Sequence, residues 1–302
     1  MNFFSKKETI IQNLTYIAIM AAINVVFVLL AVFLPYLYLI LLFALPLTST
    51  FVMLFCKKRY FPIYAVATIG LCFLASINSI GDTFFYIIPS ILTGAITGFL
   101  IEKKLNGAFI IISTSLIHFL FSLATLPLIK AITGVELTES VFTLFKLNDF
   151  AYKSYLTGPF IYFTSLAQMA VTYFVLKNEI KKIGFEIKTS FTKIDILLLS
   201  LYEILMFGMT VLFAFIWKES SYTFLILGLV PSIVLLVYEL SLFNKIRCII
   251  MGIITVLFPF VYALIYPNIL DPLGILIIGI LFILINIPTF CSVFAKSETV
   301  TN

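Results

Sequence analysis

The sequence predicts an all-α polytopic membrane protein with about ten transmembrane helices. Hydrophobic residues make up 62% of the 302 residues, charged residues make up 11%, and the mean hydropathy is +1.18. Soluble globular domains are about half apolar and about a quarter charged, so this chain lacks the polar surface that such a domain needs. This composition excludes a nucleic-acid-binding module, a secreted disulfide scaffold and a conventional cytosolic enzyme.

The predicted helices are continuous apolar runs, whereas the strands of a membrane barrel would alternate and would be only about 9–11 residues long. The first two runs are separated at Leu34-Pro35-Tyr36, and the third and fourth at Ile80-Gly81-Asp82-Thr83. The runs cover residues 14–34, 36–55, 62–80, 83–101, 107–129, 159–176, 194–216, 222–243, 248–266 and 272–294.

The basic residues predict the orientation of these helices, because Lys and Arg accumulate in short loops on the cytoplasmic side. With the N-terminus inside, all but four of the 19 Lys and Arg fall on inner segments; the exceptions are Lys130, Lys146, Lys153 and Lys218. We therefore predict that both termini are cytoplasmic. Lys outnumbers Arg seventeen to two, and Phe and Ile are abundant, which is typical of an AT-rich bacterial genome and predicts a bacterial inner membrane. The net charge of +5 then marks the inner face and requires no nucleic acid as partner.

Two segments outside the predicted membrane helices organise the chain. In the outer segment, 130–158, Thr133 and Glu136 have the spacing of a capping box, and an amphipathic helix should follow it. That helix is either an interfacial connector or a lid over a substrate. The basic inner segment, 177–193, is predicted to separate a six-helix membrane domain, 1–176, from a four-helix membrane domain, 194–302.

Glu203 and His118 are the most prominent polar residues within the predicted spans. Glu203 is nine residues into its span, about 13 Å deep, so it must be protonated, face a wet cavity or pair with another helix. His118 lies midway along the fifth span. A single imidazole cannot make a zinc site by itself, so His118 either contacts a ligand, relays protons or packs through hydrogen bonds.

Four further polar residues are candidate substrate contacts. Asn24, Asn78 and Gln168 could converge with His118 if their helices bundle, although hydrogen bonds between helices would also explain them. Asp82 lies in an outer turn, where it could contact a ligand entering from outside or serve only as a turn residue.

Small residues predict close helix contacts. Ser90, Gly94 and Gly98 recur every four residues, and Gly228 and Ser232 do the same later in the chain. The sequence contains no Walker A loop, GxSxG elbow or HExxH motif, so we expect no enzyme activity, no bound metal and no cofactor.

Several stretches resemble known membrane proteins. The first helix LTYIAIMAAINVVFVLLAVFLPYL, the motif LFCKKRY and the stretch SINSIGDTFFYIIPSILTGAITGFLIEKKLNG are similar to the start of substrate-binding S components of energy-coupling-factor transporters. With KNEIKKIG and YPNILDPLGILIIGILF added, the whole chain resembles the YybS-like family of uncharacterised bacterial membrane proteins. This resemblance implies a six-helix S-component-like bundle followed by four further helices.

The resemblance also implies partners. In S components an alanine motif on the first helix docks onto a membrane coupling subunit that is joined to ATPases, and Ala18, Ala21 and Ala22 match that motif. The ligand would lie near Asn78 and Asp82, toward the outer face.

Three functions follow from these observations. The chain is expected to be a substrate-binding component for uptake of a small molecule or vitamin, energised by partner subunits. Alternatively, it is a membrane assembly or scaffold protein that transports nothing, or a proton-coupled carrier centred on Glu203 and His118. In each case the lipid bilayer surrounds it.

Overall fold

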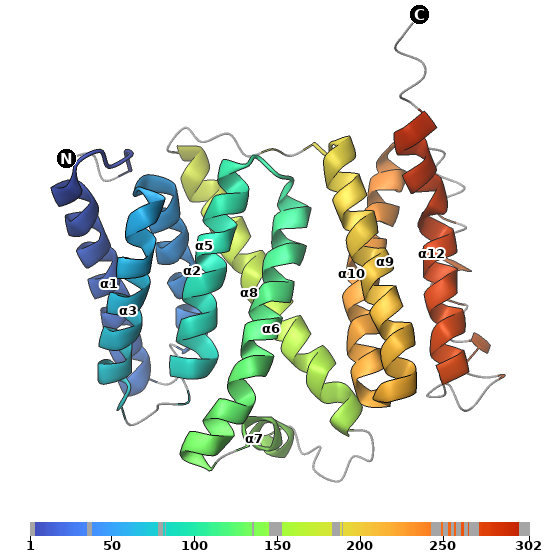
Figure 1. The fold of residues 1–302 in the computed structure, drawn as a ribbon, viewed down its shortest axis with the longest axis horizontal. Helices are drawn as coiled ribbons and strands as arrows, with labels where there is room; N and C mark the ends of the chain where they lie inside the picture. Colours follow the sequence, from blue (N-terminus) through green and yellow to red (C-terminus); the bar gives the residue numbers. More distant parts are fainter. Residues whose placement is uncertain are drawn as a thin grey trace, which may run out of the picture. The chain divides into compact units, whose positions relative to one another are not determined.

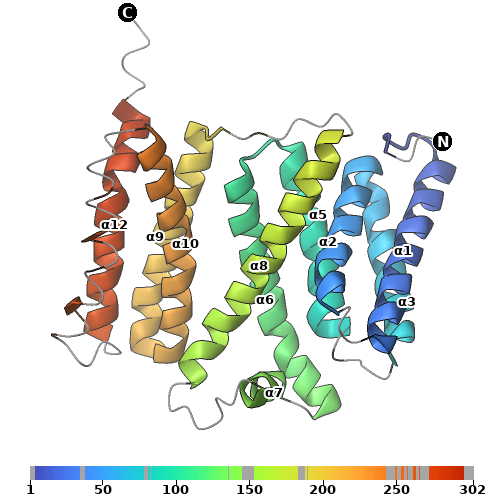
Figure 2. The same cartoon turned by 180° about the vertical axis from the view of Figure 1, so that it is seen from behind.

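The structure is a computed structural model of the chain, and all of the regular structure that it describes is helical (Figures 1 and 2). This confirms the predicted all-α class. The described residues are 4–34, 38–77, 81, 83–134, 136–144, 153–182, 188, 190–242, 249, 253–254, 257, 261–262, 265 and 272–295.

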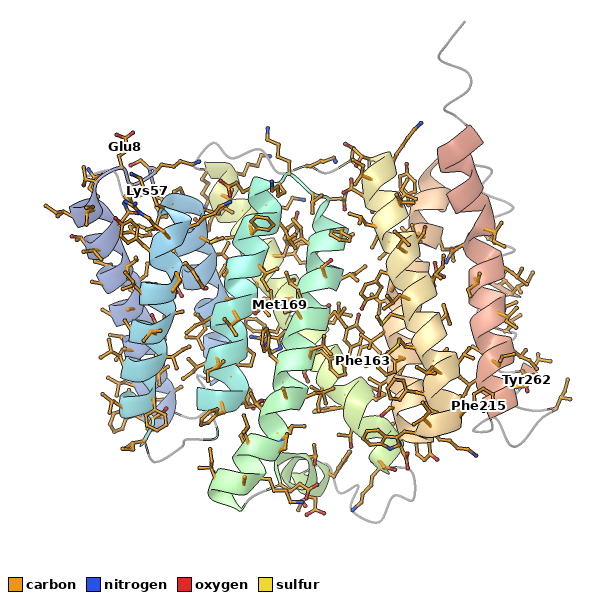
Figure 3. All side chains as sticks on the ribbon, in the orientation of Figure 1. Glu8, Lys57, Phe163, Met169, Phe215 and Tyr262 are labelled. Carbon is orange, nitrogen blue, oxygen red and sulfur yellow. The ribbon has the colours of Figure 1, made fainter. Side chains whose placement is uncertain are left out.

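Six helices in the described ranges are long and apolar enough to cross a membrane. They are α1 (Ile10–Phe33), the segment Phe84–Glu102, α6 (Gly107–Thr133), α8 (Lys153–Lys182), α9 (Lys193–Ile216) and the segment Lys218–Tyr238. Many of their large apolar side chains face outward, and Phe215, labelled in Figure 3, is 73% exposed. The chain is therefore compatible with a multi-pass membrane protein, while the number of about ten spans stays a prediction.

Other helices fall on predicted runs. They are α2 (Tyr38–Phe55), α3 (Phe61–Ala75) and α12 (Pro272–Ala295). The segment Lys218–Tyr238 named above is part of α10 (Lys218–Leu242). The fourth run is a π-helical turn, η4 (Thr83–Ile87), followed by α5 (Ile88–Glu102), and a 3-10 turn, η2 (Lys58–Tyr60), precedes α3. Most of the predicted run 248–266 lies outside the described residues.

Local capping fixes several helix ends. Thr192 and Asp195 form a capping box at the start of α9, and Thr9 and Gln12 form another at the start of α1. Gly134 follows the C-terminal end of α6 and has φ 70°, a left-handed conformation that suits glycine at a helix C-terminus. The Thr133 hydroxyl donates to the carbonyl of Ile129, so Thr133 belongs to the end of α6. The expected amphipathic helix follows as α7 (Leu137–Leu144).

The chain divides into two compact units, which are described separately. Unit 1 comprises Met1–Phe150 and Phe163–Thr189, and unit 2 comprises Ala151–Tyr162 and Ser190–Asn302. The start of α8 thus belongs to unit 2 and the rest of α8 to unit 1. Because α8 continues to Lys182, the beginning of the predicted linker 177–193 is helical.

In unit 1, α2 packs closely on α5 through the predicted face of small residues. A Cβ atom at Gly94 would lie 2.7 Å from Ser49 Cβ, and one at Gly98 would lie 2.8 Å from Met53 Cβ. This close approach lets Ser49 Oγ donate to the Ile91 carbonyl of α5 over 2.5 Å. The predicted contact face is therefore confirmed, because only small residues allow such backbone proximity.

One end of unit 1 gathers basic residues that the sequence places on the inner side. Lys58 Nζ lies 2.6 Å and Lys6 Nζ 3.9 Å from carboxyl oxygens of Glu102 at the end of α5. The Lys7 amide donates to the Phe55 carbonyl, and burial lowers the pKa of the Lys7 ammonium below its usual value. Glu8 and Lys57 lie at the same end (Figure 3). These residues therefore share one end of unit 1, while the orientation of that end in a membrane stays a prediction.

In unit 2, α9 packs against α10 and α12. A Cβ atom at Gly228 on α10 would lie 3.3 Å from the Phe207 ring, and one at Gly279 on α12 would lie 3.0 Å from the same ring. Phe207 is 1% exposed and forms a core with Leu225 and Ile278. The two glycines therefore bring three helices close around one aromatic ring.

Candidate functional site

The candidate site in unit 1 is a buried set of polar side chains. They belong to helices α5, α6 and α8, which are labelled in Figure 2. We name it the His118 cluster; its members are Ser90 on α5, His118 and Ser122 on α6, and Ser165 and Gln168 on α8. Each member is 5% exposed or less. Intramembrane polar groups that face the interior of a bundle are candidates for function, because they are costly to bury.

Helical spacing brings these side chains together. His118 and Ser122 are four residues apart on α6, and Ser165 and Gln168 are three apart on α8, so each pair lies on one helix face. His118 Nδ1 lies 3.0 Å from Ser165 Oγ and 3.3 Å from Ser122 Oγ. Gln168 Nε2 donates to Ser90 Oγ over 2.9 Å. The cluster therefore connects three helices through side-chain hydrogen bonds.

Two buried polar atoms in the unit 1 parts of α6 and α8 have no hydrogen-bond partner among the described residues. They are His118 Nε2 and Thr172 Oγ1, which lies one helical turn beyond Gln168 on α8. A neutral imidazole has one donor and one acceptor nitrogen, so Nε2 takes whichever role Nδ1 leaves to it. An unpaired buried polar atom costs about 1–3 kcal/mol, and a ligand that bonds to it would recover this energy.

The chemistry of the cluster is that of neutral hydrogen bonding. Hydroxyl, amide and imidazole groups line it, and none of its five members is a carboxylate, Lys or Arg. Among the described residues, no three His, Cys, Asp or Glu side chains come together as a metal site. The arrangement suits a polar, uncharged group.

Asn24 belongs to a different set of contacts. Its Nδ2 donates to Tyr64 Oη over 2.8 Å, and Thr48 Oγ1 donates to its Oδ1 over 2.7 Å. Thr48 and Tyr64 are also 3.1 Å apart, so the three side chains form a ring between α1, α2 and α3. Asn24 thus makes the interhelical hydrogen bonds that the sequence allowed as its alternative role. Asn78 and Asp82 lie outside the described residues.

The alanines of α1 divide between two faces. Ala18 and Ala22 are exposed, whereas Ala21 is 3% exposed and packs in the core of unit 1. Of the three alanines, only Ala18 and Ala22 are therefore accessible at the surface of unit 1. The separation follows from helix geometry, because residues four apart share a face and their neighbour turns away from it.

Glu203 pairs with other helices in unit 2, which is one of the three roles that the sequence allowed. Ser232 Oγ of α10 lies 2.5 Å from Glu203 Oε1, and Asn286 Nδ2 of α12 lies 2.6 Å from the same oxygen.

Four residues that make these interhelical contacts were not predicted from the sequence: Asn286, Thr48, Tyr64 and Ser165. Asn286 carried a signal, because an amide within the apolar run 272–294 is costly to bury.

Comparison with known protein families, with characterised proteins and with solved structures finds no match to this chain. The resemblance to the YybS-like family therefore remains a proposal carried by the motifs quoted above.

Proposed function

We propose that the chain is a YybS-like, multi-pass protein of the bacterial inner membrane that binds a small molecule and works with a membrane coupling subunit and ATPases. The observation that carries this proposal is the unpaired Nε2 atom of His118, buried beside hydroxyl and amide groups in unit 1. A histidine retained only for packing would gain by pairing both ring nitrogens, since each unpaired buried atom is destabilising.

The cluster favours an uncharged polar ligand. Its side chains offer hydroxyls, a neutral imidazole and the Gln168 amide, while a charged ligand would need a counter-charge that the five members do not supply. We expect the ligand to fill the hydrogen-bonding capacity of His118 Nε2 and Thr172 Oγ1.

The exposed face of α1 supports the proposed partner. Ala18 and Ala22 lie on it with Leu14, which is 42% exposed, so a second helix can approach closely there. A transporter without a nucleotide site of its own needs such a contact with an energising subunit, or an ion gradient.

Native mass spectrometry of the purified full-length protein tests ligand binding. We expect a co-purifying small molecule on the wild type, and about tenfold weaker retention in His118→Leu, the loss of roughly one hydrogen bond. Thr97→Val is a matched control, because Thr97 is 1% exposed but its hydroxyl donates only to Thr93 of its own helix over 2.8 Å. Equal retention in wild type and His118→Leu would refute the site.

Affinity purification from native membranes tests the docking face. Ala18→Leu with Ala22→Leu should remove the coupling subunit and ATPases, whereas Ala131→Leu, an exposed alanine on α6, should keep them. Recovery of only non-transport membrane proteins, together with no bound small molecule, would favour the assembly or scaffold function instead.

A further inference from the structure

Unit 2 contains a second buried polar cluster, formed by Glu203 of α9, Ser232 of α10 and Asn286 of α12. Figure 1 labels these three helices. Their exposed fractions are 2%, 4% and 5%. Both Ser232 Oγ and Asn286 Nδ2 approach the same carboxyl oxygen, Glu203 Oε1, at 2.5 Å and 2.6 Å. One carboxyl oxygen thus receives the hydrogen bonds of two other helices.

Only the nitrogen of the Asn286 side-chain amide makes a hydrogen bond among the described residues. Its Oδ1 atom is buried and has no hydrogen-bond partner among the described residues. An amide oxygen is solely an acceptor, so it needs a donor, and leaving it unpaired is destabilising. A proton on the second carboxyl oxygen of Glu203 would supply the donor that this atom lacks.

The opposite orientation of the amide leads to the same requirement. Amide nitrogen and oxygen are assigned from hydrogen bonding, so the flipped arrangement has to be considered as well. In that arrangement Asn286 Oδ1 would lie 2.6 Å from Glu203 Oε1, and two acceptor oxygens at that distance need a proton between them. Both orientations therefore favour a protonated carboxyl.

No cation among the described side chains of α9, α10 or α12 is close enough to balance an ionised Glu203. Lys193 is ten residues before Glu203, about 15 Å along α9, and Asp195 is about 12 Å away. On α10, Lys218 precedes Ser232 by about 20 Å, and the described side chains of α12 include no titratable group. The remaining titratable groups described on the packed elements are Tyr202, Glu219, Tyr222 and Tyr238, together with Lys153, Tyr155 and Tyr162 at the start of α8.

We propose that Glu203, Ser232 and Asn286 form a proton-binding site in which protonated Glu203 donates its O–H to Asn286 Oδ1 while Asn286 N–H donates to Glu203 Oε1. The site takes one proton from water and returns it to water on ionisation, so no other reactant is needed. Ionisation leaves the amide oxygen unpaired and places a charge within an apolar bundle, which opposes it. This site is independent of the proposed small-molecule site, because all three residues belong to unit 2.

Infrared spectroscopy of the full-length protein in lipid nanodiscs at neutral pH tests the proposal. We expect a protonated carboxyl C=O band that shifts to lower frequency in D2O and disappears in Glu203→Gln. Glu8→Gln is the matched control, because Glu8 is exposed and its removal should leave the band in place (Figure 3). A wild-type spectrum without such a band, or an unchanged band in Glu203→Gln, would overturn the proposal.

Asn286→Leu supplies a second measurement that does not depend on the folding of Glu203→Gln. Losing the N–H donor to Oε1 should move the carboxyl band to higher frequency without removing it. A band that stays at the wild-type frequency would mean that Glu203 and Asn286 are not paired, and would overturn the proposed ring. Retention of the small molecule is measured separately, so failure of one proposal does not imply failure of the other.

Discussion

Two clusters of similar composition differ in how completely their hydrogen bonds are paired. Each joins three helices through one asparagine, one aliphatic hydroxyl and one further oxygen group. In unit 1 these are Asn24, Thr48 and Tyr64; in unit 2 they are Asn286, Ser232 and Glu203. Both amide atoms of Asn24 are bonded, whereas Asn286 Oδ1 has no partner among the described residues.

The difference comes from the third group of each cluster. A tyrosine hydroxyl both donates and accepts, so Tyr64 can accept from Asn24 and donate to Thr48, closing the ring. A carboxylate only accepts, so the ring around Glu203 closes only when the acid is protonated. Burial of a polar group is thus no sign of function by itself. A buried polar atom without a hydrogen-bond partner is the more useful indicator of a functional site.

Of the substitutions that test this comparison, Asn24→Leu should lower the free energy of unfolding the most. It removes two hydrogen bonds from a fully buried ring, and we expect the free energy of unfolding to fall by about 2 kcal/mol. Denaturant unfolding of the purified protein measures this, with Thr97→Val as the control that leaves interhelical bonds intact. A change no greater than that of the control would show that the ring does not stabilise unit 1.

Asn286→Leu should have a smaller effect, about 1 kcal/mol of unfolding free energy, because Glu203 keeps its bond from Ser232. The measured value also distinguishes the two forms of the ring. If Glu203 is ionised, the substitution instead takes a hydrogen-bond donor away from a buried charge, and the free energy of unfolding should fall by about 3 kcal/mol. The same unfolding assay separates these outcomes.

Glu203→Gln should have the smallest effect, less than about 0.5 kcal/mol, because glutamine has the shape of protonated glutamate and supplies one acceptor and a donor group. The thermal midpoint of the variant should therefore match that of the wild type at neutral pH. A shift in either direction equivalent to more than 1 kcal/mol would contradict a protonated Glu203, since replacing a buried charge is not a neutral change.

Hydropathy and local patterns predicted much of the fold. The helical class and the helix positions at α6 and α9 depend on residues close together in the chain. The small-residue face around Gly94 was also predictable, because its four-residue spacing lies within one helix. The candidate site was predicted less completely. His118 and Gln168 were selected, but Ser90 was assigned only to packing, and Ser165 was missed because serines are common in membrane helices.

The sequence alone therefore determined that this is an apolar, helical chain with few charged residues, since each helix satisfies its own backbone hydrogen bonds from local residues. Tertiary structure decided which of those polar groups meet. Asn286 reaches Glu203 across 83 residues of chain, and Gln168 reaches Ser90 across 78. Such meetings depend on how helices pack and rotate against one another, which the polarity of a single residue does not encode.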